Sequence, residues 1–389
     1  MALLIRKEKI EKNTDMILNM ERYRETTKIE TKFETKELKE ILNFIWKWIR
    51  PASFANQNGN IPFIVSSNKI KYCSEADYHE EAICIWDWGS ANVHYVNWDF
   101  SVSDHVYLLE NKDVENINLK YVYYILSKNL EVIEWWFQWQ WLKNVSKKYL
   151  ESIAIPLPSR EIQDKIVIEL DNYQKIIDWA NVIVENYKPT IQINPEWKMM
   201  KFWDLYLEPS KNWLTKPTSI RWSGYKMVNM GELFANDKIW DIDMELVPLT
   251  DSEKDKNWLQ ENDLLFARQS LTIQWAWKCS IITEIKEYTT FESHIIRVRL
   301  NEELVNPYFY FYYLNSLNSP VKSIVTYNWQ AWIRWSELSE LFVIYPPLEI
   351  QNQIVAEIEK EEVMVENAKQ LIEVFEKKIK DKIDEIWGK

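Results

Sequence analysis

The side chains that could carry chemistry in this chain are basic and amide groups in polar loops, and they form no catalytic constellation. The four His residues are scattered, and the three Cys residues, Cys73, Cys84 and Cys279, are too few and too widely spaced for a disulfide framework or a zinc site. No glycine-rich phosphate loop ending in Gly-Lys-Ser or Gly-Lys-Thr occurs. The pattern predicts buried free thiols, no metal, no cofactor and no enzymatic activity.

The polar loops carry the residue types that read base edges in DNA. Arg and Lys pair with O6 and N7 of guanine, whereas Asn and Gln pair with N6 and N7 of adenine. For each residue taken alone, an ordinary solvated loop side chain is the alternative. The candidate DNA-binding residues are Lys47, Arg50, Gln140, Lys143, Asn144, Lys216, Arg221, Arg268, Gln269, Gln330 and Arg334.

The net charge of −12 argues against a simple basic surface that wraps DNA. Acidic residues are dense in 349–386 and sparser in the segments ahead of the predicted helices, so a partner subunit could supply much of the phosphate contact. No run of 18 apolar residues occurs, and the N-terminus lacks the pattern of a secretory signal. We therefore expect a cytoplasmic protein without a membrane span.

The elements that position these loops form an internal repeat with a shift of 188 residues. Pro158-Ser-Arg-Glu-Ile-Gln163 aligns with Pro346-Pro-Leu-Glu-Ile-Gln351. Upstream matches at the same shift pair Asn118, Tyr124, Leu126, Leu150, Ile153 and Ile155 with Asn306, Tyr312, Leu314, Leu338, Leu341 and Val343. One shift maintained across this distance indicates duplication of a single module.

A helix with coiled-coil spacing follows each repeated Pro. The first seam contains Ile166, Leu170, Tyr173, Ile177, Ala180, Val184 and Tyr187, and the second contains Ile354, Ile358, Val365, Ala368, Ile372, Phe375 and Ile379, interrupted only by Glu361. Residues 160–187 would span about 42 Å at about 1.5 Å per residue. Two matched seams favour antiparallel pairing of the helices with each other, and packing of each helix on its own domain is the alternative.

The segments ahead of the helices contain short strands rich in β-branched and aromatic residues, at 83–85, 101–109, 264–266 and 294–300. Short aromatic helices are expected at 121–126 and 308–314. We therefore predict an α+β fold in which two similar mixed domains are joined by two long antiparallel coiled-coil helices, with an internal pseudo-two-fold repeat. The expected divisions are an N-terminal segment 1–30, domains 31–158 and 195–346, and spacer helices 159–194 and 347–389.

The composition contains 22 Trp and only 5 Gly, although average usage predicts about 27 Gly in this length. Many Trp have turn-forming neighbours, as in Trp86-Asp-Trp-Gly-Ser90, Trp275-Ala-Trp-Lys278 and Asn328-Trp-Gln330, and turns favour Gly because it accepts positive φ. Our hypothesis is that the gene uses UGA for glycine and that these codons have been translated as tryptophan. The alternative is a genuine Trp-rich surface that stacks on bases.

The repeated motifs resemble those of the specificity subunit of type I restriction–modification systems. The resemblance covers roughly residues 36–386 and rests on Ile155-Pro-Leu-Pro-Ser-Arg-Glu-Ile-Gln163, its copy Tyr345–Gln351, Asp99–Tyr107, Asp263–Ser270 and Trp275–Ser280. Several departures from the family pattern place Trp where the family has Gly, which supports the recoding hypothesis. Asn60-Ile-Pro-Phe63 is only faintly similar to the Asn-Pro-Pro-aromatic motif of adenine methyltransferases, and no cofactor-binding glycine motif accompanies it.

The resemblance implies that two target-recognition domains each read one half of a bipartite site in double-stranded DNA, with the helices fixing the gap. It also implies adenine-N6 methyltransferase subunits that use S-adenosylmethionine and an ATP-dependent restriction subunit as partners. Residues 12–24 resemble the C-terminal tail of a methyltransferase subunit, so the C-terminal specificity part of a fused methyltransferase or restriction enzyme is an alternative, testable by reading the DNA upstream of Met1. A coiled-coil scaffold without a DNA role is a further alternative.

Peptide mass spectrometry of the protein from its native host tests the recoding hypothesis directly. We expect the residue mass of glycine at positions 86, 88, 275 and 277, because these positions match glycines in the family pattern. Trp387, near the end of the second helix, serves as the internal control and is expected to keep the mass of tryptophan. Tryptophan at all four test positions would refute the hypothesis.

Overall fold

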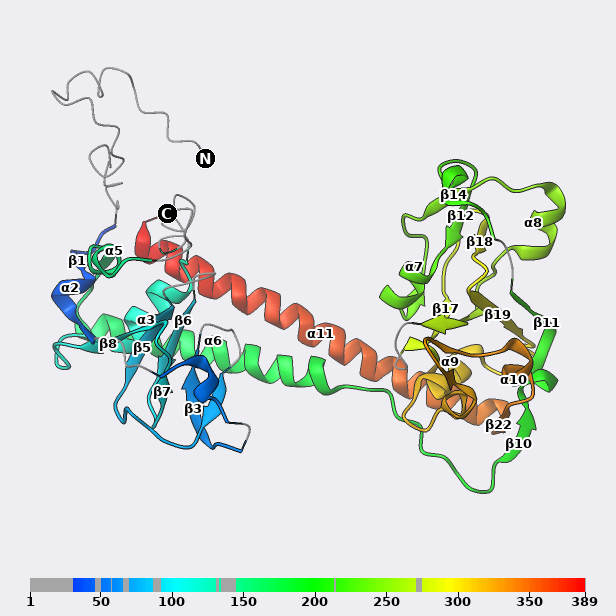
Figure 1. Ribbon diagram of the computed structural model, residues 1–389, viewed down its shortest axis with the longest axis horizontal. Coiled ribbons are helices and arrows are strands. Elements are labelled where there is room, and N and C mark those ends of the chain that lie inside the picture. The colour runs from blue at the N-terminus through cyan, green and yellow to red at the C-terminus, as the bar shows by residue number, and fades with distance from the viewer. Residues whose placement is uncertain are drawn as a thin grey trace, which may run out of the picture. The chain divides into compact units, whose positions relative to one another are not determined.

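The computed structural model describes residues 31–45, 50–56, 58–65, 70–86, 92–130, 133, 145–212, 215–270 and 275–388. The chain divides into two compact units (Figure 1). Unit 1 contains the described parts of 1–182 and 369–389, and unit 2 contains those of 183–368. Each unit combines mixed α/β structure with parts of two long helices, which confirms the predicted fold class. Within the described residues, no helix has the length and apolar character needed to span a membrane.

Unit 1 is built on an antiparallel sheet with the strand order β2-β8-β5-β6. Its strands are β2 (Leu42–Ile45), β5 (Ala82–Trp86), β6 (Val93–Val96) and β8 (Val106–Asn111), and every residue of the central strand β5 is buried. A second sheet has the order β4-β3-β7, from Lys71–Cys73, Ile61–Ile64 and Ser101–Val102. The helix α3 (Leu119–Ser127) packs on β6.

The predicted single strand at 101–109 is wrong in one respect, because the structure divides it into β7 and β8. The amide of Val106 donates to the carbonyl of Ser103 at 3.2 Å, which closes a turn between the two strands. The first strand then pairs with β3 and the second with β2 and β5. The sequence pattern at 101–109 continues through the turn, so it does not show that the chain passes from one sheet to the other.

Unit 2 repeats this strand order and adds one strand at the edge. Its main sheet is β11 (Tyr206–Asn212), β19 (Ile295–Leu300), β15 (Leu264–Ala267), β17 (Cys279–Ile282) and β13 (Lys238–Ile239), in that order. A second sheet has the order β14-β12-β18, from Glu245–Val247, Tyr225–Val228 and Thr289–Phe291. A third has the order β16-β21-β20, from Gln269–Ser270, Ala331–Trp332 and Thr326–Tyr327. The helices α7 (Met230–Ala235) and α8 (Asp251–Asn257) also belong to unit 2.

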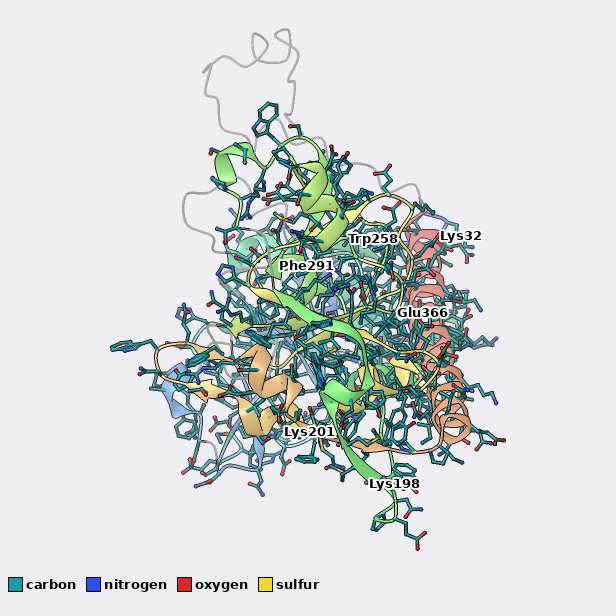
Figure 2. The ribbon with its side chains drawn as sticks, turned by 90° about the vertical axis from the view of Figure 1, so that its right-hand side faces the viewer. Lys32, Lys198, Lys201, Trp258, Phe291 and Glu366 are labelled. Carbon is teal, nitrogen blue, oxygen red and sulfur yellow. The ribbon has the colours of Figure 1, made fainter. Side chains whose placement is uncertain are left out.

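The elements next to the long helices repeat with the predicted shift of 188. They are α3 and α9 (Pro307–Asn315), α5 (Lys147–Glu151) and α10 (Trp335–Ser339), and β9 (Ala154–Pro156) and β22 (Phe342–Tyr345). In unit 1, β1 (Thr35–Glu37) pairs with β9 and leads into α2 (Leu38–Ile41). In unit 2, β10 (Lys198–Lys201) pairs with β22, and Figure 2 labels the first and last residues of β10.

The long helices are α6 (Arg160–Asn186) and α11 (Leu348–Trp387). Within unit 1 they lie side by side (Figure 1), with the rings of Tyr173 and Phe375 5.3 Å apart and Lys382 3.1 Å from Glu169. From the first of these contacts to the second, the residue number decreases along α6 and increases along α11. The two helices are therefore antiparallel, as predicted. Within unit 2, the hydroxyl of Tyr187, the residue after the end of α6, donates to Glu361 of α11 at 3.1 Å. Glu361, the residue that interrupts the apolar seam, therefore has a polar partner.

The backbone at the described Trp residues differs from the expectation of left-handed turns. The only described residue other than Gly with positive φ is Asn262, at 71°. Trp86 lies at the end of β5 and is buried, so it is not in a turn, whereas Trp329 is 90% exposed at the tip between β20 and β21. The composition and the family pattern therefore carry the recoding hypothesis, and the described dihedral angles do not add to it.

A buried Gln ties each long helix to its domain, and its replacement should destabilise the protein. Gln351 is fully buried, accepts from the amide of Asn306 at 2.9 Å and donates to the carbonyl of Pro346 at 2.8 Å. Gln351→Leu keeps the approximate shape but leaves both backbone groups unpaired, so we expect a loss of about 2–4 kcal/mol in the free energy of unfolding. Urea unfolding measures it. Gln353→Leu, at an exposed position on the same helix, is the control, and an equal loss in both variants would contradict the prediction.

Candidate nucleic-acid interface

Four of the predicted DNA-binding residues meet on the small sheet of unit 2. We call the sheet β16-β21-β20, with the flanking Arg268 and Arg334, the β16 platform. Gln269 pairs with Trp332, and Tyr327 pairs with Ala331. The amide of Ile333 donates to the carbonyl of Arg268 at 2.9 Å, which joins the two segments beyond the strand ends. Arg268, Gln269, Gln330 and Arg334 thus come together although the two pairs are about 60 positions apart in the sequence.

The basic and amide side chains of the β16 platform are available to a ligand. Arg268 and Gln330 are exposed, and Gln269 is half-buried. Among the described residues, no acidic group forms an ion pair with Arg268 within 4.0 Å. The side chain of Arg334 is 59% exposed, lies 3.6 Å from Glu337 and stacks 4.6 Å above the ring of Trp332. An exposed guanidinium beside amides can bind phosphate oxygens or the guanine edge.

The tip of the β16 platform also exposes aromatic surface. Tyr327 is 57% exposed and Trp329 is 90% exposed. Exposed aromatic rings beside Arg suit stacking on unpaired bases as well as contact with groove edges. If the native residue at 329 is Gly, the Asn328-Gly pair becomes a strong hairpin-turn signal and Tyr327 remains the exposed aromatic ring.

Three predicted DNA-binding residues have acidic partners within their own unit. Arg50 lies 2.6 Å from Asp77 and 3.0 Å from Glu75, and the hydrogen bond to Asp77 raises the pKa of its guanidinium. Lys216 lies 2.7 Å from Glu253. Arg221 donates to the Lys216 carbonyl at 2.9 Å and approaches Glu245 at 3.5 Å. Their contacts favour a structural role, and a DNA contact by any of them stays a prediction.

The remaining predicted residues, Lys47, Gln140, Lys143 and Asn144, lie outside the described residues, as does the methyltransferase-like segment 12–24. The shift of 188 places residues 138–144 opposite 326–332, the segment that contains β20 and β21. The prediction for Gln140, Lys143 and Asn144 therefore corresponds to the same position in the module as the β16 platform.

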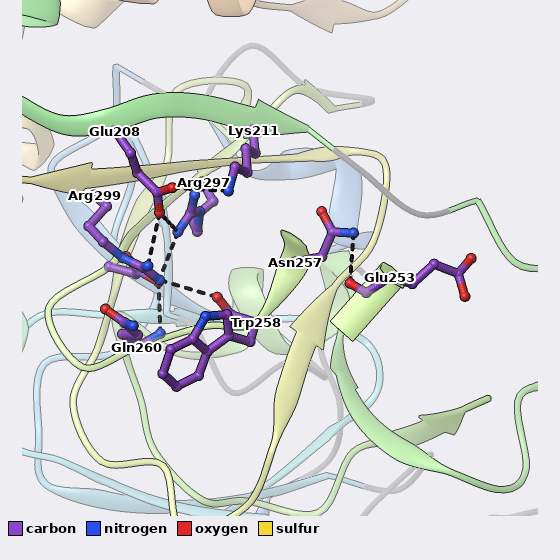
Figure 3. Close-up of polar contacts among 9 residues, drawn as sticks. Glu208, Lys211, Glu253, Asn257, Trp258, Gln260, Arg297 and Arg299 are labelled. Atoms are coloured by element: carbon purple, nitrogen blue, oxygen red, sulfur yellow. Dashed lines mark hydrogen bonds and ion pairs between the residues drawn. The ribbon is translucent and has the colours of Figure 1, made fainter. Parts of the chain in front are cut away.

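An ionic network on the main sheet of unit 2 was not predicted from the sequence (Figure 3). Arg297 and Arg299, two apart on β19, donate to Glu208 of β11 at 2.7 and 2.9 Å. Arg299 also donates twice to Asp263 at 2.7 Å, just ahead of β15. Arg297 is 1% exposed and Asp263 fully buried. The available signal was the spacing of the two Arg, because strand residues two apart lie on one face.

The network also shifts the ionisation of its two carboxyls. Burial alone would raise the pKa of Glu208, but hydrogen bonds from Arg297 and Lys211 lower it to about 2. Burial raises the pKa of Asp263 despite its bonds to Arg299. The network joins β11, β19 and the start of β15, and β15 leads directly into Arg268 and β16. It therefore braces the strand from which the platform extends.

Glu208→Gln should destabilise unit 2, because the Gln oxygen can still accept from Arg297 but the buried guanidinium then has only one carboxylate near it, that of Asp263 at 3.9 Å. We expect a loss of about 3 kcal/mol in the free energy of unfolding near neutral pH. The Glu208 carboxylate stabilises the fold above its ordinary pKa of 4.5, and this contribution disappears as pH falls towards about 2. Wild type and variant should therefore converge across that window in chemical unfolding. Glu284→Gln, which alters an exposed pair with Lys286, is the control, and a pH-independent difference would contradict the assignment.

Comparison with known proteins confirms the resemblance. The EcoKI specificity subunit of Escherichia coli K12, a type I restriction enzyme subunit, is 22% identical over 121 residues, which cover 30% of this chain and 26% of that protein. The match thus spans only about a quarter of that relative's length.

Solved structures show the same fold. The type I S subunit from M. genitalium has a TM-score of 0.55 at 11% identity, over 92% of this chain and 96% of that one. A structure concerned with complex assembly and conformational transition of the type I R-M system has a TM-score of 0.56 at 13% identity, with the same coverage. The family described as "Type I restriction modification DNA specificity domain" matches residues 30–185 and 194–377. Since these matches cover most of the chain, the protein belongs to the type I restriction modification DNA specificity domain family.

Proposed function

We propose that this chain is the DNA-reading, non-catalytic subunit of a type I restriction–modification complex. One observation carries the proposal: the same domain occurs twice, each copy is tied to the start of a long helix by the same buried hydrogen bonds, and the family match covers both copies. Two copies of one scaffold that differ outside the shared elements suit the reading of two different half-sites. In unit 2 the β16 platform is the proposed reading surface.

The proposed partners are adenine-N6 methyltransferase subunits that use S-adenosylmethionine and an ATP-dependent restriction subunit. The net charge of −12 supports dependence on them, because phosphate binding by a single chain needs clustered cations. Several cations are also neutralised internally, as Lys216 and Arg50 show. The complex would therefore bind DNA more tightly than the chain alone, with the partners supplying much of the phosphate contact.

The β16 platform should affect recognition of one half-site. Arg268→Ala and Arg334→Ala should each weaken binding of the methyltransferase-bound complex by about 1–3 kcal/mol, because each removes a guanidinium that pairs with phosphate or guanine. One tenfold change in Kd corresponds to about 1.4 kcal/mol. Methylome sequencing of the host would identify the target, and titration of labelled duplexes would measure the affinity.

The pattern of loss separates the competing functions. Lys286→Ala, at an exposed position between β17 and β18, outside the platform strands, is the control and should leave the affinity unchanged. Relaxed selectivity confined to one half-site is the expected result for the Arg variants. Binding without any sequence selectivity by the wild-type complex would instead favour the scaffold alternative.

A further inference from the structure

In each unit a carboxylate on the long helix is held by a Tyr and a Lys of the attached domain. In unit 1, Asp171 of α6 accepts from the hydroxyl of Tyr124 at 2.6 Å and from the ammonium of Lys120 at 2.7 Å. In unit 2, Glu362 of α11 accepts from the hydroxyl of Tyr312 at 2.8 Å and from the ammonium of Lys238 at 2.6 Å. We call these two groups the helix clamps.

The two helix clamps are built from partly different positions of the module. Tyr124 and Tyr312 are equivalent at the shift of 188, but Asp171 and Glu362 are 191 apart. The carboxylate of unit 2 therefore lies about one helical turn further along its helix. Lys120 comes from α3, whereas Lys238 comes from β13, a strand without a counterpart among the described strands of unit 1. The two copies thus share the Tyr, whereas the carboxylate and the Lys come from different positions, which a simple copy of the ancestral module would not produce.

Each helix clamp lies beyond a first attachment point on the same helix. The buried Gln163 and Gln351 hold the first turns of α6 and α11. Asp171 lies eight residues after Gln163, and Glu362 lies 11 after Gln351, or about 12 and 16 Å along the axis at about 1.5 Å per residue. Besides this attachment, apolar residues of the helix such as Ile166, Val167 and Leu170 pack in the core of unit 1, but apolar packing is not directional. A second point at this distance fixes the direction of the helix relative to the domain.

The chemistry of the helix clamps suits a rigid contact. Tyr124 and Tyr312 are only 2% and 3% exposed, so their rings cannot turn away without loss of packing. Burial, together with the adjoining carboxylate, raises the pKa of both hydroxyls above the ordinary value, which keeps them protonated as donors. Lys238 also donates to the hydroxyl of Tyr312 at 3.1 Å, which closes a three-member network.

We propose that Asp171 and Glu362 are positioning residues that fix the angle between each recognition domain and its helix, and thereby the number of base pairs accepted between the two half-sites. This inference rests on the proposed function. DNA turns once in about 10–10.5 base pairs, so one added base pair rotates a half-site by about 35° as well as moving it. A domain held at one angle rejects that rotation, whereas a domain free to pivot tolerates it.

The test removes only the two clamp hydroxyls. The variant is Tyr124→Phe with Tyr312→Phe, and the matched control is Tyr121→Phe with Tyr310→Phe. The control hydroxyls donate to the carbonyls of Pro156 and Ile344 within their own domains, both at 2.8 Å, and these acceptors lie in β9 and β22, not in the long helices. Both variants lose two buried hydroxyls from α3 and α9, so their stabilities should fall by similar amounts.

The readout is spacing selectivity of the methyltransferase-bound complex. The target is first selected by the wild-type complex from duplexes with randomised half-sites, and Kd is then measured with the gap unchanged and changed by one base pair. In the clamp variant, the preference for the unchanged gap should fall about 5- to 10-fold, with affinity for the unchanged site within about threefold. The control should keep the wild-type preference.

Other outcomes overturn the inference and separate it from the proposed function. An unchanged preference in the clamp variant, or an equal fall in the control, would overturn the clamp role alone, provided that scrambling either half-site still abolishes tight binding. If scrambling has no effect on the wild type, the proposed function fails as well. Asp171→Asn with Glu362→Gln, which keeps an acceptor oxygen but removes the charge, repeats the test should the Phe variants fail to fold.

Discussion

The attachment of each domain to the first turn of its long helix is the constraint on which the rest of this structure depends. Gln163 and Gln351 are fully buried, and the amide of each joins the residues just before its own helix to the start of α3 or α9. The oxygen of Gln163 accepts from the amide of Asn118 at the start of α3, and its nitrogen donates to the carbonyl of Pro158 just before α6. A buried amide is tolerated only when its hydrogen bonds are satisfied. This requirement explains why both copies keep a Pro just before the helix and a Gln five residues later, at a shift of 188.

Away from this attachment, the same sheet carries opposite chemistry in the two units. The strand register pairs Cys84 with Leu108 in unit 1 and Leu265 with Arg297 in unit 2. Two residues further along, Glu110 occupies the position of Arg299. Unit 1 thus has an apolar residue and an acid where unit 2 has two arginines bound to Glu208 and Asp263. Strand order is determined by backbone pairing and apolar alternation, so side chains on this face can change charge while the fold stays constant.

The sequence predicted what depends on period and repetition, and it failed where partners are distant in the chain. The heptad seams and the shift of 188 were sufficient to predict two antiparallel helices, because both are local patterns repeated many times. The meeting of Arg268 with Gln330 and Arg334 was not predictable, because it depends on the two pairings between β16 and β21. Residue type alone also could not distinguish Arg268, which is exposed, from Arg50, which forms an ion pair with Asp77.

The recoding hypothesis bears on the proposed interface without removing its basis. If Trp329 and Trp332 are glycines in the native protein, the hairpin loses one exposed ring and Arg334 loses the ring on which it stacks. The backbone pairing of β16, β21 and β20 needs no Trp side chain, so Arg268, Gln269, Gln330 and Arg334 would still converge on one small sheet. Arg334 would be less restrained, and its N–H donors, which lie in the guanidinium plane and are not occupied by stacking, would remain available to phosphate. The hydrogen-bonding groups of the platform, and not its tryptophans, therefore carry the case for base reading.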